Sequence, residues 1–532
     1  MRRHRKYILP SFFFFLLITL LVFWRARSTG EYANENEVEH KNDDHQQRLK
    51  RNIKFKETWL KRNKTAKSII SATNLPGIYL REAYRVADDE IRLVYLENQD
   101  NRRGLQAMIH TNWEPMSSFC FNSTCMDYLF CSIATRIATV TVPPKTPHLS
   151  TLAVKADGAD EFFTIPLSDV RVKSSKYEHQ LGVCLQPIFF FTDWTIISQF
   201  FESWIAQGAT KFYFYLHSYN KQTKQVLDFY KQSLGDGLEL IEWSDLPVHS
   251  RDRGDYYKDP NARVFRYGAT AFMHDCLLRS RSHVKFVSNT DLDDLPVSEN
   301  LHVVQQLEDA SRRHPQAGQF VVDWILSHQK QSWDSISTML DVRFDLQAVR
   351  VLELESIRYD YRVSKKMFHR PERVIHFDMH SVYRNELIPG TEEQYTTLQM
   401  FGSSKLFFLH LRRFERHLVS PPDVDYDDSF DYNLLMRLNS KMSMSYVQRL
   451  KNSTLSEVDM TPWALEARET IRNLEQCRLE GFGTRLDDKN QMCQQSSAGC
   501  AGMLTTGIDF IRTSLTWIDV AHSANFNNYT DK

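Results

Sequence analysis

KFVSNTDLDDLP, at residues 285–296, is the most informative part of this sequence. It begins as an apolar, strand-like run and ends in three carboxylates within four residues, at Asp291, Asp293 and Asp294. Carboxylates this close need a cation, and Asp oxygens suit hard divalent ions such as Mg²⁺ or Mn²⁺. Ligands bind at the carboxyl ends of strands in open α/β sheets. The stretch therefore predicts a metal-bridged diphosphate site, and the alternative is an Asp-rich surface turn.

Alternating strands and helices precede this stretch from residue 177 onward. The patterns predict strands at 183–191, 212–216 and 238–243, and helices at 194–206, 223–234 and 267–279. Such alternation favours a mixed, mostly parallel sheet flanked by helices, which is an α/β fold. The acidic stretch then follows the fourth strand, so it lies where a nucleotide-binding half-sheet presents its ligand site.

The N-terminus carries a membrane-targeting signal. Residues 8–24 are uncharged and almost wholly apolar, and four basic residues precede them, at Arg2, Arg3, Arg5 and Lys6. A cleaved signal peptide has a shorter apolar core and a small-residue cleavage site, so we expect an uncleaved anchor. The charge balance places residues 1–7 in the cytosol. A short, Phe-rich span suits a thin membrane, which predicts a single-pass type II protein of the Golgi.

Sequons and cysteines agree with a lumenal location. Asn-x-Ser/Thr patterns occur at Asn63, Asn122, Asn452 and Asn528. The eight cysteines fall into an N-terminal trio, a central pair and a C-terminal trio. An even number in an oxidising compartment predicts disulfide bonds, although the spacing does not specify their pairing. No CxxC pair occurs, which argues against a zinc site.

The chain divides by composition. Residues 25–74 are charged and poor in apolar side chains, so we interpret them as a stem that does not fold alone. Residues 75–176 are rich in β-patterns and predict a small accessory domain, 177–440 the catalytic domain, and 441–532 a C-terminal extension without a functional signal. Lys plus Arg and Asp plus Glu both number 66, which removes a global electrostatic case for nucleic acid.

Ordered residues in the central part resemble the glycosyltransferase family 92 domain. The matching pieces are Gln186-Pro187, Trp194, Gly208-Ala209, Phe214-Tyr215, Trp243, Asp275-Cys276, Asp291-Leu292-Asp293-Asp294, the stretch from Lys366 to Pro371, Val374, His380 and His410-Leu411-Arg412. The resemblance covers roughly residues 180–430. It implies a GT-A fold and sugar transfer from a nucleotide donor with inversion, and it alone suggests galactose from UDP-galactose.

The acidic stretch and a late histidine form the predicted metal site. Asp291 and Asp293 are two residues apart, so on an extended segment their side chains share a face and could bind Mn²⁺ or Mg²⁺. Asp294 would point elsewhere and bind the ribose or the donor sugar's hydroxyls. The resemblance implies His410 as a third metal ligand, with His380 as the second choice.

Other residues are candidates for the nucleotide sugar and for catalysis. Asp193 and Tyr215 follow from strand-end geometry, which places them near the nucleotide. Arg412, or its neighbour Arg413, could pair with the diphosphate through two hydrogen bonds. Inversion needs a carboxylate that deprotonates the acceptor. Asp323 follows a strand-like run and is our candidate, with Glu353 and Glu355 as rivals that spacing does not separate.

These observations predict a membrane-anchored, metal-dependent hexosyltransferase. Its partners would be a UDP-sugar donor and a glycan acceptor, either an N-glycan or another glycoconjugate. The alternative is a catalytically inactive, membrane-anchored glycan-binding or receptor-like protein, which would more readily lose the metal ligands. A phosphotransferase or sulfotransferase is disfavoured because no Gly-rich loop of the Walker type occurs.

Overall fold

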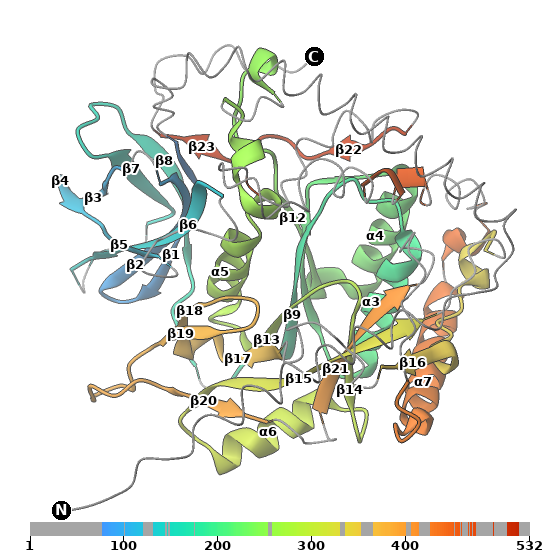
Figure 1. The fold of residues 1–532 in the computed structure, drawn as a ribbon. Coiled ribbons are helices and arrows are strands. Elements are labelled where there is room, and N and C mark those ends of the chain that lie inside the picture. Colours follow the sequence, from blue (N-terminus) through green and yellow to red (C-terminus); the bar gives the residue numbers. More distant parts are fainter. Residues whose placement is uncertain are drawn as a thin grey trace, which may run out of the picture. The chain divides into compact units, whose positions relative to one another are not determined.

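Two large β-sheets and their covering helices, with two small two-stranded sheets, make up most of the described part of the chain (Figure 1). The computed structural model describes most of residues 77–451 and shorter parts of 453–520, with its larger gaps at 121–130, 330–335, 353–364, 401–405 and 414–425. The predicted anchor at 8–24 and stem at 25–74 lie outside the described residues. No helix among the described residues is long and apolar enough to cross a membrane.

The first sheet is built from the residues before 170 and from one strand near the C-terminus. Its order is β4-β3-β7-β8-β1-β2-β6-β5, with β23 paired to β1. The strands are β1 (Ile78–Ala87), β2 (Glu90–Asn98), β3 (Leu105–Ile109), β4 (Asn112–Pro115), β5 (Ser117–Cys120), β6 (Ile133–Thr141), β7 (Thr151–Ala156), β8 (Phe163–Asp169) and β23 (Ile518–Asp519).

The second sheet carries the acidic stretch and has the order β12-β10-β9-β13-β17-β15-β21-β14. Its strands, with β16 and β20 paired to β15, are β9 (His179–Ile188), β10 (Lys211–Leu216), β12 (Leu238–Glu242), β13 (Val284–Thr290), β14 (Asp294–Ser298), β15 (Ala317–Gln329), β16 (Val349–Val351), β17 (Lys365–His369), β20 (Thr396–Gln399) and β21 (Leu406–Arg413). The first four strands of this order are parallel. Beyond β13 the pairing is mixed, because β17 is antiparallel to both β13 and β15.

Five α-helices flank the second sheet within the described residues. They are α3 (Trp194–Ala206), α4 (Lys221–Leu234), α5 (Ala269–Ser280), α6 (Val303–Arg313) and α7 (Tyr432–Leu450). The bounds of α3 agree with the predicted helix at 194–206. Asp193 caps its N-terminus by accepting from the Ile196 N–H. Gly208 adopts φ 97°, which few other residues tolerate, and lets the chain turn into β10.

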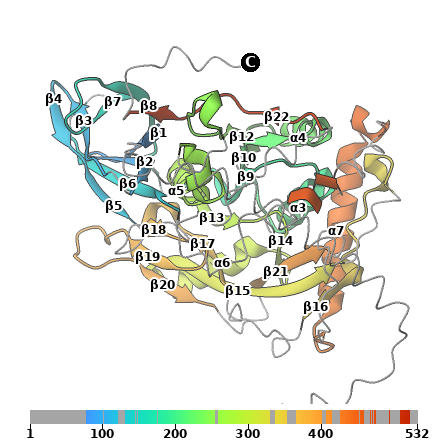
Figure 2. The ribbon, with the colours of Figure 1, turned by 45° about the horizontal axis from the view of Figure 1, so that its top comes forward.

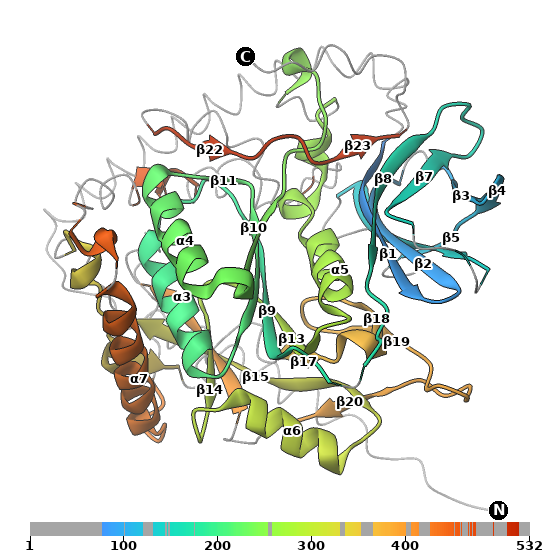
Figure 3. The ribbon, with the colours of Figure 1, turned by 180° about the vertical axis from the view of Figure 1, so that it is seen from behind.

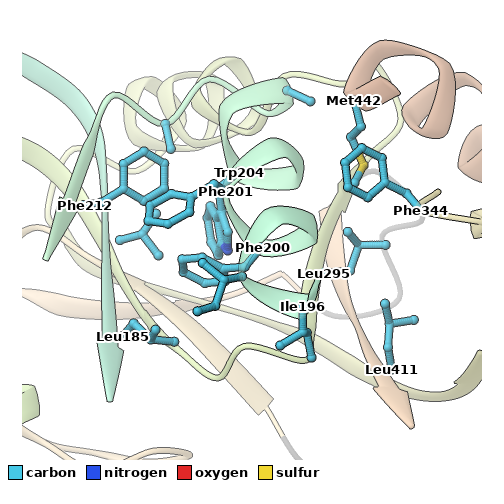
Figure 4. Close-up of a cluster of buried hydrophobic side chains, with 14 of the residues drawn as sticks. Leu185, Ile196, Phe200, Phe201, Trp204, Phe212, Leu295, Phe344, Leu411 and Met442 are labelled. Atoms are coloured by element: carbon cyan, nitrogen blue, oxygen red, sulfur yellow. The ribbon is translucent and has the colours of Figure 1, made fainter. Parts of the chain in front are cut away.

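The two faces of the second sheet carry separate cores. On β10, Phe212 and Phe214 pack against the ring of Phe201 on α3, as part of the cluster in Figure 4. Tyr213 and Tyr215 alternate with them and face the core that contains α5. Figure 3 shows α3 and α4 side by side, and α3 also contacts α7. We call these the α3 face and the α5 face.

The first sheet contacts the second through α5, which touches β1, β2 and β6 (Figure 2). Asp275 on α5 is buried and accepts from the Tyr84 hydroxyl of β1 at 2.6 Å and from the Tyr215 hydroxyl of β10 at 2.5 Å. Glu386, which follows the hairpin of β18 (Val374–Phe377) and β19 (Val382–Asn385), accepts from Arg92 of β2 at 2.7 Å. The two sheets are therefore joined by buried polar contacts as well as by apolar packing.

The C-terminal region returns to both sheets. Helix α7 continues through residue 440, where the sequence suggested a boundary. Further on, β22 (Ile511–Arg512) pairs with β11 (Ser218–Tyr219), and β23 pairs with β1. Disulfide bonds join Cys131 to Cys493 and Cys184 to Cys276. The region after 440 thus packs on the sheets of the preceding residues.

Candidate active site

The acidic stretch forms a turn between two strands of the second sheet. β13 ends at Thr290, and β14 begins at Asp294. The Asp294 N–H donates to the Asp291 carbonyl at 3.2 Å, so residues 291–294 are not extended. The expectation that Asp291 and Asp293 share one face of an extended segment is therefore wrong, because the two-residue alternation applies only within a strand. The side chains must be placed by their contacts.

Asp294 is the organising carboxylate of this turn. Its residue is 2% exposed, and its two oxygens accept hydrogen bonds from five donors. Oδ1 accepts from Trp324 Nε1 at 2.8 Å and from His410 Nδ1 at 3.0 Å. Oδ2 accepts from Lys366 Nζ at 2.6 Å, the Asp291 N–H at 3.0 Å and the Thr290 hydroxyl at 3.3 Å. A carboxylate has about four lone-pair sites, so Asp294 is saturated.

This saturation changes the role expected for Asp294. The sequence suggested that it binds the ribose or the donor sugar, but a buried carboxylate with every lone pair in use has no capacity for a sugar hydroxyl. Burial raises the pKa of Asp294, but the charge of Lys366 and the hydrogen bond from His410 outweigh burial and hold the pKa well below its usual range. Asp294 therefore stays ionised and holds β21, β15 and β17 around the turn.

Lys366 is the cation that balances this carboxylate. It lies on β17, is 3% exposed, and places Nζ 3.1 Å from Asp291 Oδ2 as well as 2.6 Å from Asp294. Burial lowers the pKa of Lys366, but the charges of Asp291 and Asp294 outweigh burial and raise it above its ordinary value. The ammonium therefore stays charged. In the sequence, Lys366 stands out only as the first residue of a stretch that resembles the family, without a predicted role.

His410 faces the turn from the neighbouring strand. Asp294 of β14 and His410 of β21 are directly paired in register. The His410 ring lies 4.2 Å from the ring of Trp324, and its Nδ1 is also 3.8 Å from Asp293 Oδ1. Its Nε2 is buried and has no hydrogen-bond partner in the part of the chain that the structure describes. His380, the second choice, bonds through Nδ1 to the Lys365 carbonyl at 2.8 Å, and its ring is 6.4 Å from Trp324.

Asp293, Asp294 and His410 could hold a divalent ion, since one ligand atom of each lies within 4.8 Å of the others. Two carboxylates and an imidazole are a plausible donor set for Mn²⁺. The buried Nε2 of His410, without a partner among the described residues, fits this role. Asp294 bonded to Nδ1 resembles the carboxylate that commonly orients a metal-bound histidine. The residues present therefore fit a metal, with Asp291 placed beside Lys366 instead of in this group.

Two predicted site residues lie away from the cluster. Tyr215 is fully buried on the α5 face, where its hydroxyl donates to Asp275. A nucleotide-binding role for Tyr215 is wrong, because strand alternation turns its side chain into the core. Asp323 precedes Trp324 on β15, and alternation places it on the α5 face beside Lys365 in register. The structure thus does not bring Asp323 to the Asp294–His410 cluster.

The remaining predicted residues are only partly placed. Asp193 is buried and caps α3, and it also accepts from the Thr195 hydroxyl at 2.7 Å. Arg412 lies on β21 opposite His328, and its side chain lies outside the described residues. Glu353 and Glu355 also lie outside them. Trp324, the residue after Asp323, donates its indole N–H to Asp294.

Comparison with known proteins adds a family. The family model described as glycosyltransferase family 92 matches residues 179–460. No match was found among curated proteins. Among solved structures, TarS of S. aureus aligns at 14% identity over 58% of this chain and 46% of its own, with a TM-score of 0.24. TarS residues 1–349 align at 13% identity over 59% of this chain and 77% of their own, with a TM-score of 0.22. Amylomaltase from Corynebacterium glutamicum aligns at 15% identity over 29% of this chain and 23% of its own, with a TM-score of 0.14.

The structural likenesses are too low in TM-score to support an argument about fold or activity, and the aligned part spans less than half of the length of TarS. The family match is different in kind. It covers more than half of the 532 residues and includes the acidic turn, Lys366, Trp324 and His410. On that basis the chain belongs to glycosyltransferase family 92.

Proposed function

We propose that this glycosyltransferase has a GT-A fold and transfers galactose from UDP-galactose to a glycan acceptor, with inversion and with a divalent metal. One observation carries the proposal. Two carboxylates and an imidazole gather within 4.8 Å at the carboxyl end of β13, which is the edge where open α/β sheets bind their ligands. Family membership supports the nucleotide-sugar donor.

The metal would be held by Asp293 and His410, and Asp294, whose oxygens already accept hydrogen bonds from the protein, would orient the His410 ring through Nδ1. When bound, Mn²⁺ or Mg²⁺ would neutralise charge that grows on the departing diphosphate. The chain's own residues prepare that site. Asp294 fixes the His410 ring through Nδ1 and so directs Nε2 away from itself, and the Trp324 ring packs on His410 at 4.2 Å.

Lys366 keeps the turn in one arrangement before any ligand binds. Its ammonium contacts Asp291 and Asp294 together, so two like charges remain close without a metal. Such preorganisation matters because a catalytic group that must first move loses part of its effect. The base that inversion requires stays a prediction: Asp323 lies on β15 outside the Asp294–His410 cluster, and Glu353 and Glu355 stay as its rivals.

The proposed location is the Golgi membrane, as a type II protein with a lumenal catalytic domain. The apolar segment at 8–24 and the basic residues before it support this topology. The two disulfide bonds support an oxidising compartment such as the secretory pathway.

The test is galactose transfer by the full-length chain from UDP-galactose to arrayed glycans, with Mn²⁺ and with a chelator. Asp293→Asn removes a proposed metal ligand, so we expect a loss of about 100-fold or more. Asp428→Asn, at an exposed aspartate, is the matched control and should keep full activity. Unchanged melting temperatures would show that both variants fold. Equal activity of Asp293→Asn and the unmodified chain would refute the metal role, and failure of the unmodified chain to bind any sugar nucleotide would refute the function.

A further inference from the structure

Residues 510–517, which we call the C-terminal strap, cross the carboxyl ends of two strands of the second sheet. β22 pairs with β11, directly after β10, and the Thr513 N–H donates to the His217 carbonyl at 3.1 Å. The Thr516 N–H donates to the Ser244 hydroxyl, just beyond β12, at 2.9 Å. Trp517 then packs on Trp243 at 5.0 Å between ring centroids. Figures 1 and 3 show β22, which is part of the strap, and β23, which follows it, in red along one edge.

A row of aromatic rings lies under the strap. Phe189 contacts Tyr267 at 5.2 Å, and Tyr267 lies 3.9 Å from the ring of His217. His217 in turn lies 6.5 Å from Phe190, and Phe190 lies 5.5 Å from Phe510 of the strap. Phe190 adopts φ 46°, a conformation that a bulky residue rarely takes without a constraint. The turn after β9 is therefore held in an unusual shape next to the strap.

This row lies on the ligand-binding edge at a defined spacing from the acidic turn. The strand order β10-β9-β13 places β10 two strands away from β13, which ends at the acidic turn. Two strand spacings are roughly 10 Å. That span is comparable with the reach from a diphosphate to its nucleobase. If the diphosphate lies at Asp293 and His410, the base extends over β9 and β10, where Phe189 and Phe510, the partly exposed rings of this row, can stack on it.

The strap brings one cation to this place. The guanidinium of Arg512 lies 5.2 Å from the ring centroid of Phe190, and the residue is exposed. No ion pair of Arg512 is formed with another residue in the described parts of the chain. Its backbone is fixed by pairing with Ser218. A planar guanidinium can donate two hydrogen bonds to neighbouring acceptors, as the carbonyl oxygens of a pyrimidine provide.

The turn after β9, next to the strap, also has a hydroxyl group that can bind a ligand. Thr192, two residues after Phe190, is 2% exposed, and its hydroxyl has no partner among the described residues. Buried hydroxyls normally find a partner, so an unpaired one beside the proposed base is consistent with a polar ligand. This observation is independent of Arg512.

We propose that the C-terminal strap forms one wall of the donor's nucleobase site and that Arg512 binds the base. The inference rests on the proposed function, because it takes the acidic turn as the diphosphate site. It assigns a role to a part of the chain in which the sequence showed no functional signal. The ligand class is a uridine nucleotide, and Arg512 contributes to its recognition without a part in the chemistry.

The test compares uridine diphosphate with inorganic diphosphate by isothermal titration calorimetry on the full-length chain with Mn²⁺. Arg512→Ala should weaken binding of uridine diphosphate about tenfold, the loss expected for one charged hydrogen-bonding group. Binding of inorganic diphosphate should stay unchanged, because it has no base. Arg384→Ala is the matched control, since Arg384 is also exposed and lies 5.3 Å from the ring of Phe119. It should bind both ligands as the unmodified chain does.

Each contrary result has a distinct meaning. Equal binding of uridine diphosphate by Arg512→Ala and the unmodified chain would overturn the assignment. An equal loss for both ligands would also overturn it, by placing Arg512 at the phosphates. If the unmodified chain binds inorganic diphosphate as tightly as uridine diphosphate, the proposed base site is refuted and the proposed metal site is not. If it binds neither ligand, the proposed function itself fails.

Discussion

Asp294→Asn should destabilise the fold even though the two side chains have almost the same shape. Asp294 accepts from Trp324 and His410 on one oxygen, and from Lys366, Thr290 and the Asp291 N–H on the other. Asparagine keeps one acceptor oxygen and replaces the other by an NH₂ group that only donates. In either orientation this NH₂ group faces two or three other donors. No rotation of the amide satisfies the cluster.

The size of the effect follows from Lys366. The lysine is 3% exposed and would keep only Asp291, at 3.1 Å, as a charged partner. Removing one member of a buried ion pair costs about 3–5 kcal/mol, because the other charge is left without compensation. Asp291 offsets part of this loss, and its side chain is 23% exposed. We therefore expect the free energy of unfolding to fall by about 3 kcal/mol.

Urea unfolding of the full-length chain at pH 7 measures this change, with Asp428→Asn as the exposed control. The double variant Asp294→Asn/Lys366→Met removes both charges, so no buried ammonium is left unpaired. It should lose about 2 kcal/mol less than the sum of the two single variants, which is the coupling expected for residues in direct contact.

A loss below about 1 kcal/mol for Asp294→Asn, the level of an ordinary surface change, would refute this reasoning. Strict additivity in the double variant would also contradict it, because it would show that Asp294 and Lys366 do not depend on each other. Either result would return Asp294 to the group of residues free to bind a ligand.

Two further predictions concern Glu386, which contacts the first sheet, and the disulfide bond between Cys131 and Cys493. Burial raises the pKa of Glu386, but hydrogen bonds from Arg92 and the charges of Arg92 and Arg281 outweigh it and leave the pKa below its ordinary value. The ionised Glu386 carboxylate therefore stabilises the fold above the pKa of about 4.3 that it has in the unfolded chain, and this stabilisation is lost as pH falls through its lower pKa in the folded protein. Glu386→Gln should lower the melting temperature at pH 7, and the difference in melting temperature from the unmodified chain should become smaller below about pH 4. Glu393→Gln, at an exposed glutamate, is the control. A difference in melting temperature that is as large at pH 3 as at pH 7 would contradict the prediction. Mass spectrometry of unreduced proteolytic fragments should recover a peptide pair joined through Cys131 and Cys493, and a free thiol at Cys131 would be inconsistent with this pairing.

Local patterns predicted the parts of the fold that depend on nearby residues. The helix at 194–206 agrees with α3 because its apolar spacing, the Asp193 cap and Gly208 all lie within a few residues. The position of the three carboxylates at the end of the strand that is β13 was predicted for the same reason, although their turn was not. The insertion of β17 between β13 and β15 was not predicted, because it depends on pairing between segments that are far apart in the sequence.

The site was predicted only as a location. The two-residue alternation that grouped Asp291 with Asp293 fails because the chain turns there. Lys366 lies 75 residues from Asp291 in sequence, so no local spacing connects them. Tyr215 ends a strand, as expected, but both faces of β10 are buried, and only the register of the folded sheet shows that its hydroxyl meets Asp275.

Replacing Asp293 and replacing Asp294 should therefore have different effects, although a sequence motif treats the two carboxylates as one unit. Asp293 has a side chain that is 11% exposed, whereas that of Asp294 is 0% exposed and surrounded by donors. Replacing a residue that binds a metal or a substrate changes the stability of the protein little and its activity strongly, because the partner of that residue is the ligand. A residue that organises the protein loses stability first. Asp293→Asn should accordingly fold normally and fail to transfer sugar, and Asp294→Asn should unfold more easily at every metal concentration. If the two variants behaved alike, the division of roles between these carboxylates would be wrong, and the turn would act as a single metal-binding motif.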